Sequence, residues 1–323
     1  MVSDKANTIC VLKVLEEYSD EDHILPMREL LSKLRVQFDA ELDRRTVYSA
    51  VAMLLSLGYD ISTYEENGKG YYLRSRLFEP SEVHLLMDAV CSFPFLPAKQ
   101  SSGLIRKLQL LLSAPKRKQI RNLNVIREDG KTPNRQVFYS IEMLDEAIEK
   151  AVQVRFTYLH YTPEKLQVPR RAEPYQVSPY RMVYTNQHYY LVCRMAGTEN
   201  ISLYRIDRMR DIQLTEIFID RDNQGSAQEN VHSAIFAFTG KPERISFLCA
   251  PLLLDQVIDQ FGSGIHIATQ ADGRLKFSLT ASPKGIKFWA LQNLPYVEIL
   301  EPEWLRKEVI ESIQKSPYKE DVK

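Results

Sequence analysis

The first 76 residues carry apolar positions with the period of an α-helix, and this pattern predicts three helices. The first helix is expected to begin at Asn7 or Thr8 and the second near Pro26. The third opens at Asp43, a favourable N-cap, and ends at Gly58. Its apolar stripe consists of Val47, Ala50, Val51, Leu54 and Leu55. The opposite face at the start of this helix is polar and basic, and we expect it to face solvent.

A β-hairpin is predicted directly after the third helix. Two β-prone runs, Tyr59–Glu65 and Lys69–Leu73, flank Asn67-Gly68, and Asn-Gly between such runs is a strong hairpin signal. Three helices followed by a hairpin are typical of a winged helix-turn-helix, whose last helix enters the major groove of DNA. The predicted DNA-contacting residues are Arg44, Arg45, Thr46, Tyr48 and Ser49 on the helix and Lys69 at the hairpin tip. We expect Thr46 and Lys69 to contact phosphates rather than bases.

Charge leaves a second interpretation of this module open. Residues 1–76 hold 10 basic and 13 acidic side chains, although five of the acids gather in the run Glu16–Asp22, which is predicted to be a solvated loop. The whole chain has 42 basic and 42 acidic residues, so its net charge gives no global sign of nucleic-acid binding. The module could therefore serve protein docking or dimerisation instead of DNA binding.

Residues 77–139 continue with helical periodicity. One helix is predicted with Ser81 as its cap, and another over Ser102–Leu112. The apolar face of the first contains Val83, Leu85, Leu86, Ala89 and Val90. From Lys99 to Arg121 there are seven basic residues and no acidic one. This run could follow DNA or an acidic partner, or it could be a solvated helix face with a turn around Pro115.

The pattern changes to short strands after a helix predicted over Ile141–Lys150, with Ser140 as its cap. The predicted strands lie at Val154–Tyr161, near Tyr175, and at Arg181–Tyr184, His188–Arg194 and Ile201–Ile206. The last three form an antiparallel meander, joined by the turn Thr185-Asn186-Gln187 and by a loop that contains Gly197. About five short strands with one helix predict a small closed barrel.

Arginine and aromatic side chains alternate along this meander, and such a surface suits phosphates or bases. The candidate effector-binding residues are Arg171, Ser178, Tyr180, His188, Tyr190, Arg194, Tyr204, Arg205 and Arg208. Asp207 could instead pair with an arginine and hold it in place. Alternation puts Tyr190 and Val192 on one face of a strand and Leu191 and Cys193 on the other, without deciding which face is core.

In residues 221–323, strands and helices are predicted to alternate behind a polar run. Polar runs at Asn122–Gln136 and Asp220–Asn230 are expected to be linkers. Behind the second linker, strands and helices follow the order β-α-β-β-α-β with a hairpin at Asp272-Gly273, which predicts a ferredoxin-like unit. A last helix is expected over Glu303–Lys315.

Two motifs carry a resemblance to a known family. The run from His188 to Val192, followed by Tyr204-Arg205-Ile206-Asp207-Arg208, resembles the WYL domain of bacterial regulators, with Tyr189 in place of the usual Trp. The stretch from Asp43 to Gly58 is similar to the DeoR-type winged-helix regulators that usually precede WYL domains. The resemblance implies an Sm-like, SH3-type barrel that binds nucleic acid or a nucleotide-like effector, a C-terminal WYL extension, and a homodimer.

Composition adds few constraints. The chain is 44% hydrophobic and 26% charged, its four cysteines have no metal-ligand spacing, and its six histidines fall in no catalytic motif. No apolar run approaches the roughly 20 residues that span a bilayer. We therefore expect a cytoplasmic protein with buried, reduced thiols, without a metal or cofactor, and not an enzyme.

The sequence thus predicts an α+β multidomain regulator. The expected parts are a winged helix-turn-helix DNA-binding domain (1–76), a helical linker and dimerisation region (77–139), a WYL domain (140–220) and a ferredoxin-like extension (221–323). The expected partners are a double-stranded DNA operator, a second copy of the chain, and single-stranded nucleic acid or a nucleotide as effector. The alternative is a non-catalytic scaffold whose winged helix contacts protein.

Overall fold

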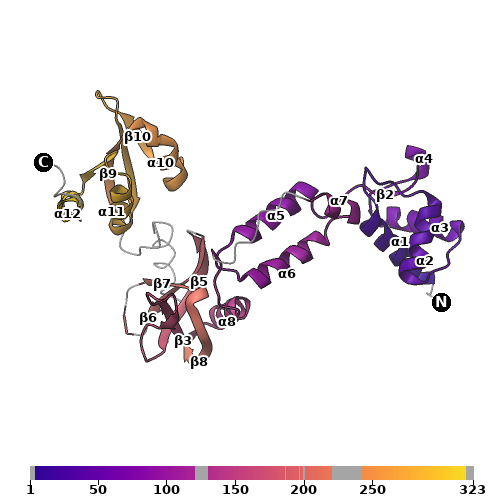
Figure 1. Ribbon diagram of the computed structural model, residues 1–323, viewed down its shortest axis with the longest axis horizontal. Coiled ribbons are helices and arrows are strands. Elements are labelled where there is room, and N and C mark those ends of the chain that lie inside the picture. Colours follow the sequence, from indigo (N-terminus) through magenta and orange to yellow (C-terminus); the bar gives the residue numbers. More distant parts are fainter. Residues whose placement is uncertain are drawn as a thin grey trace. The chain divides into compact units, whose positions relative to one another are not determined.

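The computed structural model describes residues 4–120, 130–185, 187–195, 197–198, 201–219 and 242–317. The fold is mixed α+β, and the chain divides into two compact units, residues 1–133 and 134–323 (Figure 1). Most of the predicted linker Asn122–Gln136, the turn residue Asn186 and the predicted linker Asp220–Asn230 lie outside the described residues. Within the described ranges, no helix is both long and apolar enough to cross a membrane.

Three helices open the first unit: α1 (Asp4–Tyr18), α2 (Met27–Phe38) and α3 (Arg44–Ser56). Their common core contains side chains from all three, among them Val11, Val14, Leu15, Leu30, Leu34, Val47, Val51 and Leu54. The predicted N-cap of α3 is confirmed, because Asp43 accepts a hydrogen bond from the Thr46 N–H. In α1, Cys10 and Val11 face the core, while the Ile9 side chain is 60% exposed.

A short antiparallel sheet follows α3, with strands β1 (Ile61–Ser62) and β2 (Tyr72–Leu73). The expected two-residue Asn-Gly turn is wrong. Tyr64–Asn67 form the single-turn helix α4, which Gly68 ends with a φ of +66°. The Asn67 side chain accepts hydrogen bonds from the backbone N–H groups of Lys69 and Gly70, which stabilises this longer connection.

Helices α5 (Pro80–Ser92) and α6 (Ala98–Gln109) pack side by side as a hairpin, and α7 (Ala114–Gln119) follows (Figure 1). The hairpin has its own core of Val83, Met87, Cys91, Ile105 and Leu112. The cap of α5 is Glu79, which forms a capping box with Glu82, so the assignment of Ser81 is wrong. Leu85 is 70% exposed, because the face of α5 that packs inward is the one with Met87.

The second unit begins with α8 (Val137–Lys150), which starts three residues before the predicted cap Ser140 and buries that residue. The strands are β3 (Val152–Tyr161), β4 (Gln167–Pro169), β5 (Tyr175–Thr185), β6 (His188–Met195), β7 (Ile201–Arg205) and β8 (Met209–Phe218). Their order in the sheet is β4-β3-β5-β6-β7, and β8 pairs with β3. A 3-10 turn, Ile206–Arg208, leads from β7 directly into β8.

Both faces of β6 are buried, which explains why alternation could not choose between them. Leu191 and Cys193 belong to the main core of this sheet. Val192 belongs to a second, smaller cluster with Tyr180 and Ile219.

The C-terminal part has the predicted element order. Its elements are β9 (Glu243–Cys249), α10 (Leu254–Phe261), β10 (His266–Thr269), β11 (Leu275–Ala281), α11 (Pro283–Gln292), β12 (Val297–Glu301) and α12 (Glu303–Gln314). The strands form one antiparallel sheet in the order β10-β11-β9-β12. Trp289 packs against Phe247 in its core, while Trp304 is 43% exposed.

The cysteines are distributed evenly over these parts. The helices α1–α3, the α5–α6 hairpin, the β3–β8 sheet and the C-terminal sheet each bury one unpaired thiol, of Cys10, Cys91, Cys193 and Cys249 respectively. The prediction that the four thiols are buried is therefore confirmed.

Candidate nucleic-acid and ligand surfaces

The first turn of α3 faces solvent. The Asp43 carboxylate accepts the Thr46 N–H at 2.7 Å, and its interactions with the Thr46 side chain and with this N–H keep the pKa of Asp43 below its usual value. The cap thereby starts the helix at Arg44. Arg44, Arg45, Tyr48 and Ser49 are exposed and Thr46 is half-buried, while Val47 and Ala50 point into the core. The four exposed residues therefore share one surface that the core of the unit does not use.

Tyr48 is also linked to the strands that follow α3. Burial raises the pKa of Tyr71, and its interactions with Tyr48 and Glu65 raise it further. Tyr48 thus lies close to β2, at the junction of α3 and the hairpin. Lys69 is exposed just beyond Gly68, and Asn67 fixes its backbone.

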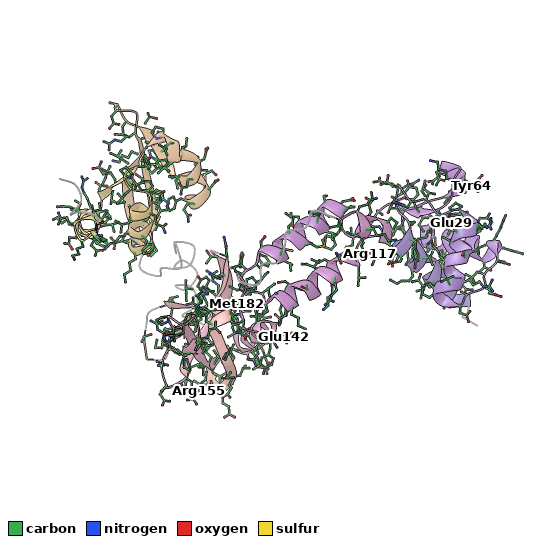
Figure 2. All side chains as sticks on the ribbon, in the orientation of Figure 1. Glu29, Tyr64, Arg117, Glu142, Arg155 and Met182 are labelled. Carbon is green, nitrogen blue, oxygen red and sulfur yellow. The ribbon has the colours of Figure 1, made fainter. Side chains whose placement is uncertain are left out.

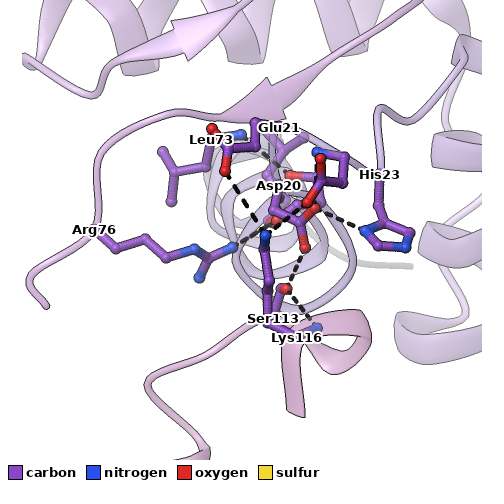
Figure 3. A network of polar contacts seen from close by, with 10 residues as sticks. Asp20, Glu21, His23, Leu73, Arg76, Ser113 and Lys116 are labelled. Atoms are coloured by element: carbon purple, nitrogen blue, oxygen red, sulfur yellow. Dashed lines mark hydrogen bonds and ion pairs between the residues drawn. The ribbon is translucent and has the colours of Figure 1, made fainter. Parts of the chain in front are cut away.

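The acidic run Glu16–Asp22 is not the solvated loop that its charge predicted (Figure 3). Asp20 is buried and accepts hydrogen bonds from the Ser113 hydroxyl and, at 2.7 Å, from His23 Nδ1. Burial alone would raise the pKa of Asp20, but these hydrogen bonds outweigh it and the pKa lies below its ordinary value. Arg76 donates to the Ser19 carbonyl at 2.7 Å beside them.

Helix α7 supplies the countercharges. Lys116 Nζ lies 2.7 Å from Asp22, and Arg117, labelled in Figure 2, pairs with Glu17. Part of the basic run thus has an acidic partner within the chain itself. In Figure 1, α7 lies on the flank of the three-helix module away from α3. Three of these acids, Glu17, Asp20 and Asp22, therefore have their partners at a distance from the exposed start of α3.

In the second unit, the turn between β7 and β8 holds a fixed ion pair. Arg205 Nε and Nη2 donate to the two carboxylate oxygens of Asp207 at 3.0 and 2.8 Å. The Asp207 side chain is only 4% exposed, and that of Arg205 is 21% exposed. Burial would lower the pKa of Arg205, but Asp207 more than compensates and raises it. A bidentate pair of this kind fixes the guanidinium plane.

His188, Tyr190 and Arg208 surround this pair. Tyr190 stands directly opposite Arg205 in the β6–β7 ladder, and the His188 ring meets the Tyr190 ring edge-on at 6.3 Å. Burial and the charges of Arg205 and Arg208 lower the pKa of His188. Burial raises the pKa of Tyr190.

Two buried polar atoms at this place have no hydrogen-bond partner among the described residues: His188 Nδ1 and Arg208 Nε. The Arg208 guanidinium carbon lies 5.8 Å from the centre of the Tyr161 ring, which is 46% exposed. Buried polar groups are usually paired, so these two atoms are candidates for contact with a bound ligand. An unpaired cation beside an open aromatic ring suits a phosphate next to a base.

The other candidate residues lie elsewhere in the sheet. Ser178 and Arg194 face each other in the β5–β6 ladder. Tyr180 belongs to the small cluster around Val192. Arg171 lies 3.6 Å over the Tyr175 ring and donates to two backbone carbonyls. Tyr204 is a core residue, and burial raises its pKa to about 12.

Three residues at or beside this turn were not predicted from the sequence: Tyr158, Tyr161 and Asn134, of which Tyr158 and Asn134 are buried. The Tyr158 hydroxyl accepts the Arg205 N–H at 3.2 Å, and Asn134 donates to the Asp207 carbonyl at 3.0 Å. Alternate side chains of a strand lie on the same face, so an inward position of Phe156 could have predicted an inward position of Tyr158. Nothing local marked Asn134, which stands in a polar stretch. No cluster of His, Cys, Asp and Glu suited to a metal occurs in the ranges that the structure describes.

Comparison with protein families gives two domain matches. The WYL domain family matches residues 140–214, which include most of α8, all of β6 and the Arg205–Asp207 turn. The WCX domain family matches residues 241–316. The chain contains a WYL domain and a WCX domain. The ion pair and the unpaired atoms of His188 and Arg208 therefore belong to the WYL domain.

A comparison with solved structures gives two matches of low sequence identity. Proteasome accessory factor B/C (PafBC) of Arthrobacter aurescens shares 16% identity at a TM-score of 0.28, with 97% of this chain and 48% of that chain covered. A CRISPR Cas-related protein shares 14% identity at a TM-score of 0.38, with 99% and 85% covered. The chain thus spans about half the length of PafBC. No curated protein matches the chain.

Proposed function

We propose that this chain is a DNA-binding transcriptional regulator whose WYL domain senses a nucleic-acid or nucleotide-like effector. The observation that carries the proposal is the exposed polar start of α3, on a helix whose other face is buried in the core. The WYL and WCX matches support a regulator, since the WYL resemblance is to bacterial regulators. The proposal includes no catalytic step.

The finer fold assignments belong to the same proposal. Three helices followed by β1 and β2 support a winged helix-turn-helix. The 3-10 turn that carries the chain from β7 to β8, which pairs with β3, supports closure of the WYL sheet into an Sm-like barrel. The sheet order β10-β11-β9-β12 supports a ferredoxin-like WCX domain.

On DNA, α3 would enter the major groove with its first turn. Arg44, Arg45, Tyr48 and Ser49 would face base edges, since they are exposed on one side of the helix. Thr46 and Lys69 would contact phosphates. A homodimer would place two such helices on an inverted repeat, with half-sites separated by whole helical turns.

In the WYL domain, Arg208 and His188 would bind a phosphate of the effector, and Tyr161 would stack on a base. Arg205 is already neutralised by Asp207, so it would orient the surface rather than supply free charge. Regulation requires that the effector bind one state of the protein more tightly than the other.

The test is DNA retention by the purified chain. Fragmented genomic DNA retained at low salt is sequenced, and affinity for the enriched site is measured over a salt series. Arg45→Ala should weaken binding by about 1–3 kcal/mol if it contacts a base edge. Arg244→Ala removes the same charge from an exposed position of β9 and should leave the affinity nearly unchanged.

Two results would contradict the proposal. Equal affinities of the Arg45→Ala variant and the parent would remove α3 as the DNA-contacting helix. No retention of DNA even at low salt would favour a scaffold that contacts protein, because phosphate contacts strengthen steeply as salt falls.

A further inference from the structure

The segment just before α8 carries two anchors close together in sequence. The first is Lys131, whose ammonium donates to the carbonyls of Val90 and Phe93 at 3.0 and 2.8 Å and to the Ser101 hydroxyl at 2.9 Å. It thereby ties the end of α5 to the start of α6. A cation is favourable there, because the last carbonyls of a helix have no partner within the helix. The Thr132 N–H adds a hydrogen bond to the Pro94 carbonyl at 2.8 Å.

The second anchor is Asn134, which is 2% exposed. Its amide donates to the carbonyls of Asp207 and Met209 at 3.0 and 3.1 Å, and its oxygen accepts the Gln136 N–H at 2.9 Å. An asparagine side chain has two donors and one acceptor oxygen, and all three are used. Asn134 therefore clamps the turn that carries the Arg205–Asp207 pair.

Only Pro133 separates the first anchored segment, Lys131-Thr132, from the second anchor, Asn134. Proline restricts its own φ to about −65°, which removes one of the backbone rotations of this short link. We infer that residues 131–134 act as a strap through which the Arg205–Arg208 turn and the α5–α6 hairpin influence each other's stability. Loosening either anchor should therefore loosen the structure at the other.

The strap is tested first without any ligand, by hydrogen–deuterium exchange of the full chain. Lys131→Met removes the anchor on α5 and α6, and it should speed exchange of the Met209 amide, which bonds to Ile206, by at least about fivefold. Asn134→Ala removes the anchor on the turn, and it should speed exchange of the Phe93 amide, which bonds to Ala89, to a similar extent. Lys107→Met and Asn293→Ala should change neither amide, because both residues lie outside the strap.

The inference is wrong if each variant loosens only its own surroundings. Lys131→Arg keeps the charge and the donors, and it should restore slow exchange at Met209. Should Asn134→Ala fail to fold, Asn134→Gln retains the amide with a longer stem. If Asn134→Gln speeds exchange only around the Asp207 turn and not at Phe93, the inference is equally wrong.

The second arm rests on the proposed function and uses fluorescein-labelled single-stranded oligothymidylate as the probe. The probe should slow exchange at Phe93 in the parent chain. In Lys131→Met it should bind with affinity within about twofold of the parent but no longer slow that amide. If the probe still slows exchange at Phe93 in Lys131→Met, the strap inference is wrong. If the probe does not bind, the effector hypothesis for it fails, while the ligand-free exchange still decides the strap.

Discussion

Arg205 and Arg208 stand three positions apart on one turn, but their surroundings give them different tasks. The Arg205 charge is satisfied by two hydrogen bonds to a buried carboxylate, which leaves little attraction for a phosphate. Arg208 has an aromatic ring near its guanidinium and an unpaired Nε among the described residues. A ring attracts a cation without neutralising it. Attraction for an anion therefore centres on Arg208.

His188 should make effector binding pH-dependent. Its pKa is lowered by burial and by the charges of Arg205 and Arg208, while Asp207 opposes them. A bound phosphate would raise that pKa again, so binding would take up a proton between the lower free-state pKa and the higher bound-state pKa. Affinity for single-stranded DNA should thus rise as pH falls from about 8 to about 6, by up to about tenfold for a shift of one pKa unit.

Fluorescence anisotropy over this pH range measures the effect. His188→Gln should flatten the profile, because a glutamine does not titrate. His160→Gln is the matched control, since His160 is an exposed residue of β3. A profile that stays as steep in the His188 variant as in the parent would assign the proton to another group.

Among the elements, α7 is held mainly by polar contacts, and none of its own residues is buried. Asp20→Asn removes the charge that Ser113 and His23 contact, and it should lower the free energy of unfolding of the first unit by about 2 kcal/mol. Asp22→Asn weakens only the exposed pair with Lys116 and should cost below about 1 kcal/mol. Urea denaturation followed by circular dichroism measures both.

The same residue should confer acid sensitivity. The folded-state pKa of Asp20 lies below the ordinary value of 3.8, so the folded state binds this proton less tightly than the unfolded state. The stabilisation is complete above that ordinary value and is lost as pH falls through the lower folded-state pKa. Asp20→Asn should remove this part of the acid dependence, and an unchanged acid profile would contradict the assignment.

The inward face of a helix could be predicted from the sequence where its apolar residues form one stripe. It could not be predicted where they form two. Helix α3 has a single apolar stripe, and four of its five predicted residues, Val47, Ala50, Val51 and Leu54, are buried. Helix α5 has two, one through Leu85 and one through Met87, and only the packing of α6 decides between them. The hairpin after α3 was predicted in kind, but the hydrogen bonds of Asn67 lengthened its turn.

The position of a polar side chain could be predicted only where its partners are near in the sequence. The exposure of Arg44 and Arg45 follows from the helical period alone. Asp20 was expected in solvent because its partner Ser113 stands 93 positions away, beyond any local pattern. Asn134 contacts the Asp207 turn 73 positions on and gave no signal for the same reason.

At the scale of the whole molecule, both tryptophans lie in the WCX domain. Because this domain has a core of its own, it should unfold independently of the rest. Urea transitions followed by tryptophan fluorescence and by far-ultraviolet circular dichroism should therefore have different midpoints. Trp304→Phe leaves the buried Trp289 as the reporter and should not change the fluorescence midpoint. Superimposable transitions would indicate one cooperative unit instead.

Each of four separate cores contains one buried cysteine, so the reactivity of each thiol reports the opening of its own core. Burial raises the pKa of all four thiols, so each is protected from alkylation until its own core opens. Mass spectrometry of the native chain, after brief treatment with an alkylating reagent, would give four separate opening rates without any substitution. Repeating the measurement with DNA or oligonucleotide present would show which core each one protects.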